Sequence, residues 1–335
     1  MRRRGWIRSA LAGAAALTLL TGCSSGEDGG DKPTIAPATP ATAPAVTGVP
    51  TGQVTPSTAI SALLAEPSTG VLAVVTDAGR TLTLIDKTGT RTVALPGVVA
   101  SLAAGKPGEI LISAPGKIIR LDTATAKTTE VALDGDVRSA AVRANGDLVA
   151  GLGTGKVLIV APDGAVRESI SGLVSADAID TCTDTVVVLD RRQTALTELN
   201  LPDKRLGLTL RTGDGAANMI GDHFGRRIVT DTAGNELLVY TADPLVLRQR
   251  FPVGSSPYAL AYDQRSETVW VTLTGSNEVV GYDLSTGIPV EVGRYPTVRQ
   301  PDSVTVDAST GDLFVGSATG DGLQRITADQ RKRGQ

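Results

Sequence analysis

Oxygen-bearing and charged side chains recur at positions where predicted strands begin or end. They are Asp177, Asp190, Arg191, Arg192, Asn218, Asp231, Tyr258, Ser276 and Asp302. If a fold brings such groups to one mouth, their oxygens could hold Ca²⁺, which takes about six to eight oxygen ligands. They could equally orient a small bound molecule. Two alternatives need no ligand: solvated turn acids, which we favour, and a salt-bridge network in which the arginines neutralise the aspartates.

Few residues are available for nucleophilic or zinc chemistry. Cys182 is the only cysteine besides Cys23, and His223 is the only histidine. A catalytic cysteine needs a histidine partner, and a tetrahedral zinc site needs more Cys and His ligands than this. We therefore predict that Cys182 is a buried or half-buried thiol and that His223 is an exposed turn residue.

Signatures of two classes of enzyme are missing as well. The chain has no S-x-D-x-G-x-T-W box, which argues against a sialidase-like enzyme, and the turn at 283–287 lacks the docking tryptophan of quinoproteins. We predict no catalytic residue, no metal site and no cofactor, with Ca²⁺ left open. The favoured function is a non-enzymatic binding or scaffold module, and the alternative is a Ca²⁺-dependent lactonase-like or hydrolase-like enzyme.

Residues 256–290 indicate how the candidate side chains would be positioned. Runs rich in β-branched and aromatic residues at 258–262, 268–273 and 277–282 favour strands. The turns between them are too short for crossover helices, so the strands must be antiparallel. A single sheet of this kind cannot bury both faces and needs copies on either side.

The rest of the chain supplies those copies. The pattern recurs from Thr58 with a period of about 40 residues, which is the length of one four-stranded propeller blade. We predict an all-β fold, a β-propeller at residues 58–329 with seven four-stranded blades; six and eight are the alternatives. The last repeat has only three strands, so residues 53–56 are expected to add its outer strand and close the ring. Residues 330–335 form a polar tail.

The amino terminus has the features of an export signal. Four arginines within residues 2–8 precede an apolar run at 10–20 that is too short for a stop-transfer helix. The run ends in Leu20-Thr21-Gly22-Cys23, which resembles the lipobox of bacterial lipoproteins. That resemblance implies that residues 1–22 are removed and that Cys23 is lipidated; an ordinary signal peptide is the alternative. Sec and twin-arginine export are both left open.

Residues 23–57 are predicted to be a linker, because Pro/Thr/Ala-rich sequence has too little apolar surface to form a core. We expect it to be disordered and partly polyproline II, with its end supplying the closing strand. Glycosylation of its threonines is left open.

The charge of the chain argues against nucleic-acid binding. The formal net charge is −3. Removing the four arginines of residues 1–22 leaves 28 basic against 35 acidic side chains, or −7. A nucleic-acid-binding protein needs a basic face, so we expect no nucleic-acid partner. We expect a monomer.

Two stretches carry a family resemblance. PYALAYD followed by TVWVTLTGSNEVVGYDLSTGIPV resembles the YVTN repeat of surface-layer and YncE-like β-propellers. The lipobox, the linker, LLVYTADPLVLRQRFPV and NEVVGYDLSTGIPVEVGRYPTVRQPDSVTVD together resemble the LppL-like propeller lipoproteins of mycobacteria and related actinobacteria. The resemblance implies anchoring in the cell membrane on its extracytoplasmic face, with a protein or envelope ligand that it does not name.

Overall fold

The computed structural model describes residues 32–331. The chain divides into two compact units, Met1–Lys32 and Pro33–Gln335, and only the second is described here. The predictions for the signal peptide, for Cys23 and for most of the polar tail lie outside the described residues. Within those residues, no helix is both long and apolar enough to cross a membrane.

Strands are the main secondary structure of the described residues. The first half of the fold contains β1 (Gln53–Thr55), β2 (Ala62–Ala65), β3 (Leu72–Thr76), β4 (Thr81–Asp86), β5 (Gly89–Ala94), β6 (Ser101–Ala104), β7 (Glu109–Asp122), β8 (Thr128–Val142), β9 (Leu148–Leu152), β10 (Val157–Val160), β11 (Val166–Ile170), β12 (Ala178–Asp180) and β13 (Val187–Asp190). The second half contains β14 (Ala195–Asn200), β15 (Arg205–Arg211), β16 (Ala216–Gly221), β17 (Arg226–Asp231), β18 (Glu236–Thr241), β19 (Val246–Pro252), β20 (Pro257–Asp263), β21 (Thr268–Leu273), β22 (Glu278–Asp283), β23 (Val290–Pro296), β24 (Pro301–Val306), β25 (Leu313–Ser317) and β26 (Leu323–Ile326). Three short 3₁₀ helices complete the set: η1 (Asp77–Gly79), η2 (Cys182–Asp184) and η3 (Ala328–Gln330).

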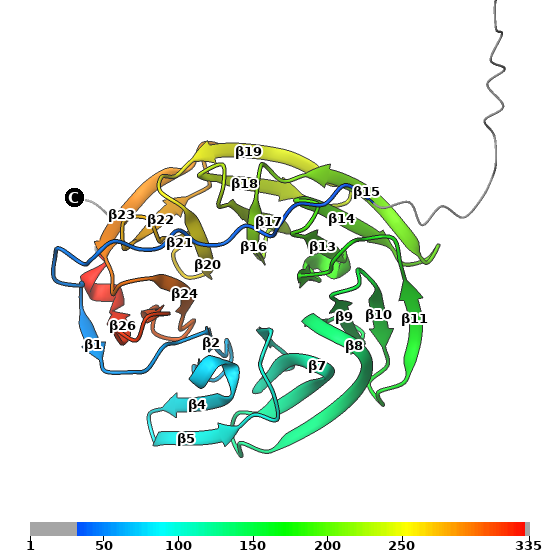
Figure 1. The fold of residues 1–335 in the computed structure, drawn as a ribbon, viewed down its shortest axis with the longest axis horizontal. Coiled ribbons are helices and arrows are strands. Elements are labelled where there is room, and N and C mark those ends of the chain that lie inside the picture. Colours follow the sequence, from blue (N-terminus) through cyan, green and yellow to red (C-terminus); the bar gives the residue numbers. More distant parts are fainter. Residues whose placement is uncertain (1–31, 332–335) are drawn as a thin grey trace, which may run out of the picture. The chain divides into compact units, whose positions relative to one another are not determined.

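The strands form antiparallel sheets arranged around a common centre, which makes Pro33–Gln335 a β-propeller and confirms the predicted fold class (Figure 1). Five sheets have four strands each: β2–β5, β12–β15, β16–β19, β20–β23, and β24–β26 with β1. A sixth sheet has six strands in the order β11-β10-β9-β8-β7-β6. Sequential pairing of this kind needs only short connections, as the turn-rich repeat predicts.

The prediction of seven blades is wrong: strand pairing gives six sheets. The residues expected to form the second and third blades share the six-stranded sheet because β7 and β8 are unusually long, at 14 and 15 residues. β7 pairs with β6 and then with β8, while β8 pairs with β7 and then with β9. A Pro115–Asp136 pairing links the two halves. The spacing of the sequence repeats gives the number of repeats. It does not reveal that two neighbouring repeats pair into one sheet.

The innermost strands contact one another in a closed circle. β2 contacts β6, β6 contacts β8, and the contacts continue through β12, β16, β20 and β24 back to β2. The six-stranded sheet thus contributes two strands, β6 and β8, to this inner ring. Residues at the starts of inner strands are thereby brought towards one end of the ring, which is where most of the candidate side chains lie.

The hydrophobic core lies between neighbouring sheets. One cluster packs Leu237 and Val239 of β18 against Val269 and Val271 of β21. Three other clusters likewise join strands of adjacent sheets, with mostly aliphatic side chains. A further cluster lies within the six-stranded sheet, between its two halves. Alternation along the strands puts these side chains into the space between sheets, and the removal of apolar surface from water holds the ring together.

The predicted closing strand is confirmed. β1 pairs antiparallel with β26, from Gln53 opposite Arg325 to Thr55 opposite Leu323. It thereby becomes the outer strand of the last sheet and joins the two ends of the propeller. All three residues of β1 are exposed, so the strand acts through its backbone hydrogen bonds and buries little apolar surface.

The segment before β1 differs from the free linker that its composition predicts. Residues 35–44, which we call the strap, run as an extended chain across the ends of the later sheets (the blue segment in Figure 1). Their backbone is hydrogen-bonded to the propeller, and Ala43 is only 2% exposed. Pro/Thr/Ala sequence lacks the apolar side chains to form a core, yet its backbone groups still bind donors and acceptors supplied by a folded surface.

Candidate functional site

The strap lies against turns and connections of four sheets, all at the same end of their strands. We call this surface the strap face. It is made by the turn between β13 and β14, the connections before β16, β20 and β24, and the turn between β21 and β22. The propeller groups that bond the strap are Arg191, Arg192, Ser256, Asn277, Arg299 and Gln300.

Two of these contacts hold the beginning of the strap. The backbone N–H of Ile35 donates to the carbonyl of Arg192 over 2.8 Å. The Nη2 of Arg191 donates to the carbonyl of Ala38 over 2.6 Å. Gly215 faces Ala38: a Cβ on Gly215 would lie 2.9 Å from the Cβ of Ala38. A glycine at position 215 is therefore needed for this close approach.

Gln300 and Ser256 bind the middle of the strap. Gln300 Oε1 accepts the N–H of Ala43 over 2.8 Å, and Gln300 Nε2 donates to the carbonyl of Ala41 over 3.1 Å. Ser256 Oγ accepts the N–H of Ala41 over 2.9 Å. The side-chain amide of Gln300 thus bonds one N–H group and one carbonyl group of the strap at the same time. This pairing fixes both the direction and the register of the bound chain.

Asn277 and Arg299 bind the end of the strap. Asn277 Nδ2 donates to the carbonyl of Pro44 over 2.9 Å, and Arg299 Nη2 donates to the carbonyl of Ala43 over 3.3 Å. Asn277 also accepts the backbone N–H of Gln300. These side chains recognise backbone groups rather than side chains, so the strap face is chemically suited to an extended polypeptide with small residues.

Part of the predicted residue set comes together beneath this surface. Asn218 Nδ2 donates to the carbonyl of Tyr258 over 3.0 Å. Burial raises the pKa of Tyr258; Arg191 opposes the shift, while the negative charge of Asp302 adds to it. Burial also raises the pKa of Asp302, against a hydrogen bond from Gln300. Arg191, Asn218, Tyr258 and Asp302 are therefore neighbours. Gln300 donates to Asp302 over 2.8 Å and so connects it to the strap.

Asp190 and Asp231 have a structural role instead. Both are fully buried at the ends of β13 and β17. Asp190 accepts the backbone N–H groups of Val174, Ser175, Arg192 and Gln193. Asp231 accepts those of Asp214, Gly215 and Gly234. Each carboxylate therefore links an inter-sheet connection to a turn through hydrogen bonds. Its oxygens accept bonds from N–H groups that would otherwise be unpaired.

Asp177 lies in a salt-bridge network at the edge of an open cavity. Its Oδ1 is 2.9 Å from Arg138 Nη1, and its Oδ2 accepts the backbone N–H of Arg191 over 2.9 Å. Arg138 also contacts Asp136 over 3.0 Å. These residues and Val98 line a cavity of about 290 Å³ beside the covered part of the strap face. The salt-bridge alternative is thus correct for Asp177.

Arg192 and Ser276 contribute little to the site through their side chains. Arg192 is exposed and bonds the strap through its backbone carbonyl. Ser276 is exposed and donates to Glu278 over 2.7 Å. In the turn between β21 and β22, it is the next residue, Asn277, that contacts the strap.

The predictions for Cys182 and His223 are confirmed. Cys182 is half-buried and its Sγ donates to the carbonyl of Asp222 over 2.9 Å. Burial raises the pKa of this thiol, which opposes formation of a reactive thiolate. His223 is exposed in the turn after β16, and its Nδ1 lies 3.0 Å from the hydroxyl of Tyr262. Residues 32–331 hold no cluster of three or more His, Cys, Asp or Glu side chains placed to bind a metal.

Sequence reasoning missed most of the residues that bind the strap. Ser256, Asn277, Arg299 and Gln300 were not among the candidates, and neither were Asp136 and Arg138 of the cavity. A signal was present for the first two, because they sit in the connection and the turn that flank the strongest repeat. Nothing in the sequence indicated that the linker would be their partner.

Comparison with known proteins finds likeness only in structure. No family model matches the chain, and no curated protein matches it. Virginiamycin B lyase from Staphylococcus aureus is similar, with 15% identity and a TM-score of 0.66 over 81% of this chain and 95% of that one. The β-propeller domain of Cps50 (Swd1) from Myceliophteria thermophila has 14% identity and a TM-score of 0.70, covering 84% and 99%.

Hydrazine synthase from Kuenenia stuttgartiensis is also similar, with 12% identity and a TM-score of 0.68 over 84% of this chain and 99% of that one. These three structures bear the names of two enzymes and of one β-propeller domain, so the likeness shows the fold and no function. The strand pairing and the comparisons agree on one conclusion: this chain contains a β-propeller.

Proposed function

We propose that this chain is a lipid-anchored protein of the extracytoplasmic cell envelope whose propeller is a non-enzymatic binding module for extended polypeptide. The binding surface is the strap face together with the open cavity beside it. The resemblance to LppL-like lipoproteins and to YncE-like propellers supports the location. The observation that supports the activity most strongly is the strap, an extended chain whose backbone is hydrogen-bonded to side chains from four loops of the propeller.

The chemistry of the surface supports polypeptide as the ligand. Gln300 pairs with the N–H of one residue and the carbonyl of another, as a neighbouring strand would. Arg191, Arg299 and Asn277 donate to carbonyl oxygens. Main-chain hydrogen bonds of this kind supply affinity for extended peptides in other proteins, while side-chain pockets supply selectivity. Here the lack of a side chain on Gly215 lets the bound chain approach the propeller closely at Ala38.

The state of the acidic residues supports binding over catalysis. Asp190 and Asp231 are saturated by backbone N–H groups. Asp177 is paired with Arg138. A general acid or base has to reach the substrate with a proton to exchange, and these carboxylates are directed to structural partners.

Binding of the strap sequence in trans tests the proposal. We would delete residues 33–45, which keeps β1, and titrate the purified protein with a synthetic peptide of the same residues. The expected result is saturable binding, measured by calorimetry, because the vacated surface presents the same donors and acceptors. Gln300→Ala in the deleted protein should weaken binding by about tenfold or more, since each lost hydrogen bond is worth roughly 1 kcal/mol and Gln300 makes two.

Two controls make the result specific. Ser276→Ala alters an exposed serine of the same face that does not bond the strap, and it should leave the affinity unchanged. A Gly/Ser peptide of equal length should bind more weakly, because a proline-containing chain loses less conformational entropy on binding. Absence of saturable binding by the strap peptide to a folded deletion variant would contradict the proposed activity.

A calcium titration distinguishes the binding module from the alternative, a Ca²⁺-dependent lactonase or hydrolase. An enzyme of that type would bind calcium at one equivalent and lose it when Asp177 and Asp302 are both replaced by alanine. A calorimetric titration of calcium into the purified chain without a heat of binding favours the binding module.

A further inference from the structure

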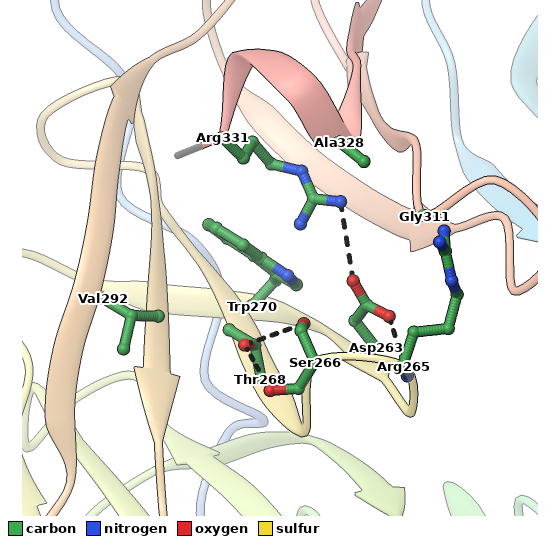
Figure 2. A pocket seen from close by; sticks show the side chains of 9 residues that line it. All are labelled: Asp263, Arg265, Ser266, Thr268, Trp270, Val292, Gly311, Ala328 and Arg331. Atoms are coloured by element: carbon green, nitrogen blue, oxygen red, sulfur yellow. Dashed lines mark hydrogen bonds and ion pairs between the residues drawn. The ribbon is translucent and has the colours of Figure 1, made fainter. Parts of the chain in front are cut away.

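A second cavity lies at the other end of the sheet β20–β23, away from the strap face. β20 begins at the strap face, next to Ser256, and ends at Asp263, where a turn leads into β21. This turn, β21 and the carboxy-terminal helix η3 enclose a cavity of about 170 Å³ (Figure 2). That volume is well above the roughly 10–15 Å³ that a single water requires, so the cavity can hold a small molecule.

Arg331 forms one wall of this cavity, and its side chain is buried. Its side chain is 5% exposed, and its guanidinium carbon lies 4.8 Å from the centre of the Trp270 ring. The nearest carboxylate is that of Asp263, at 3.5 Å from Nη2, which is a long contact for an ion pair. Burial lowers the pKa of Arg331 even though Asp263 opposes the shift. The positive charge is therefore only partly compensated.

Two buried N–H groups beside the cavity have no acceptor among residues 32–331. They are Nε1 of Trp270, a residue that is 3% exposed, and Nε of Arg331. Both side chains line the cavity, and in Figure 2 the indole nitrogen lies at the edge of the ring nearest Asp263 and Ser266. Buried donors are almost always paired in folded proteins, because an unpaired one costs free energy. These two point to an acceptor that occupies the cavity.

The charge around the cavity indicates what kind of acceptor fits. Arg265 lies at its exposed rim with its guanidinium against Gly311, so two cations, Arg265 and Arg331, face a single acid, Asp263. The hydroxyl of Thr268 also lines the cavity. An anion with two acceptor oxygens would satisfy both unpaired donors and balance the excess positive charge, and guanidinium groups pair well with such oxygens.

We propose that this cavity is a binding site for a small carboxylate, with the carboxylate oxygens accepting hydrogen bonds from Trp270 Nε1 and Arg331 Nε. Arg265 adds attraction from the rim. The cation–π contact holds the Arg331 guanidinium in place before the ligand arrives, so little side-chain entropy is lost on binding. The carboxylate can belong to a free organic acid or to the carboxy terminus of a peptide, since both present the same two oxygens.

Trp270 provides the readout. The chain has two tryptophans, Trp6 and Trp270, so a full-length Trp6→Phe protein reports on this cavity alone by intrinsic fluorescence. We would titrate it with acetate and N-acetylglycine, and with the uncharged isosteres acetamide and N-acetylglycinamide, at constant ionic strength. The expected result is a saturable change with the two carboxylates only. Tighter binding of N-acetylglycine identifies a peptide carboxy terminus, and equal or tighter binding of acetate identifies a free acid.

Substitutions test whether the fluorescence change arises from binding in this cavity. Arg265→Gln removes an exposed charge and should weaken the carboxylate response by about tenfold or more, the loss expected for a contact with a charged group. Arg248→Gln changes an exposed arginine of β19 that bonds Thr241, and it should have no effect. Melting temperatures would confirm that both variants are folded. A missing saturable response to either carboxylate, or an equal response to the amides, would overturn the proposal.

This inference is independent of the proposed polypeptide binding. The Arg191→Ala variant, which removes a strap contact, should leave the carboxylate response intact. Conversely, Arg265→Gln should leave the affinity for the strap peptide intact. Failure of one experiment therefore does not predict failure of the other.

Discussion

Arg191 and Ala38 lie 153 positions apart in the chain and are joined by a hydrogen bond of 2.6 Å from the guanidinium Nη2 to the carbonyl oxygen. The same arginine gives its backbone N–H to Asp177, at the edge of the open cavity. Arg191 therefore connects the covered and the open parts of the strap face. A ligand that entered the cavity could compete with the strap for this side chain.

Hydrogen exchange should reveal individual contacts of the strap. The amide of Ala43 donates to Gln300 Oε1 and that of Ala41 donates to Ser256 Oγ. Gln300→Ala is therefore expected to accelerate exchange at Ala43 strongly, and Ser256→Ala should do the same at Ala41. The measurement is residue-resolved amide exchange by NMR. Unchanged protection of Ala43 in folded Gln300→Ala would show that the strap is held by other means.

Truncations should separate the closing strand from the strap. Deleting residues 33–44 removes the strap contacts, and deleting residues 33–57 also removes β1 and leaves the outer edge of β26 unpaired. Because β1 is exposed and acts through its ladder, we expect its loss to cost about 2–4 kcal/mol more than loss of the strap alone. Denaturant unfolding of both proteins measures this difference, and equal free energies of unfolding would refute it.

Asp302 should make stability depend on pH. Burial raises the pKa of its carboxyl group in the folded protein above the value in the unfolded chain. The folded state then binds the proton more tightly, so stability is greatest below the unfolded pKa and falls as pH rises through the folded pKa. Asp302→Asn should therefore be more stable than the parent at pH 7, and the gap should close as pH falls towards about 4. Melting curves across this range test the sign.

A buried arginine joins two neighbouring sheets. Arg227 of β17 is fully buried, contacts Asp180 of β12 over 2.8 Å and donates to the carbonyls of Cys182 and Thr185. Arg227→Met should lower the free energy of unfolding by roughly 3–5 kcal/mol, because it leaves the Asp180 charge uncompensated. Arg248→Met, on an exposed position, should change it by less than about 0.5 kcal/mol. Replacing Asp180 by leucine in the Arg227→Met background should restore part of the loss.

Cys23 governs anchoring if the lipobox resemblance is correct. Cys23→Ala should release the protein from the membrane fraction or leave it as the uncleaved precursor, because the acyl chains that anchor it have no attachment point. Fractionation and intact-mass analysis of the mature protein provide the measurement. A mature chain without lipid on Cys23 would reject the anchor.

Local sequence was sufficient to predict the propeller. Strands such as residues 268–273 carry β-branched and aromatic residues between turn-forming segments, and this pattern repeats, so neighbouring copies must bury one another's faces. The missing fourth strand of the last repeat even predicted β1, whose pairing with β26 is confirmed. These features are local, or follow from counting local features, and therefore need no knowledge of distant contacts.

Only the tertiary structure decided how the candidate residues are used. The sequence could not distinguish Asp190, whose oxygens are taken by backbone N–H groups, from Asp302, whose pKa burial raises, because both are acids near strand ends. It also could not show that the six-stranded sheet merges two repeats, since the Pro115–Asp136 pairing depends on the path of β7 and β8.

The strap likewise combines a property that its sequence predicts with one that only the tertiary structure shows. Its composition correctly indicates that it cannot form a core of its own, but its backbone can bind any surface that offers matching donors and acceptors. That surface consists of Arg191, Ser256, Asn277, Arg299 and Gln300, which come from four separate loops. Such a constellation exists only after the ring has closed, because closure is what places these loops at one end of the propeller.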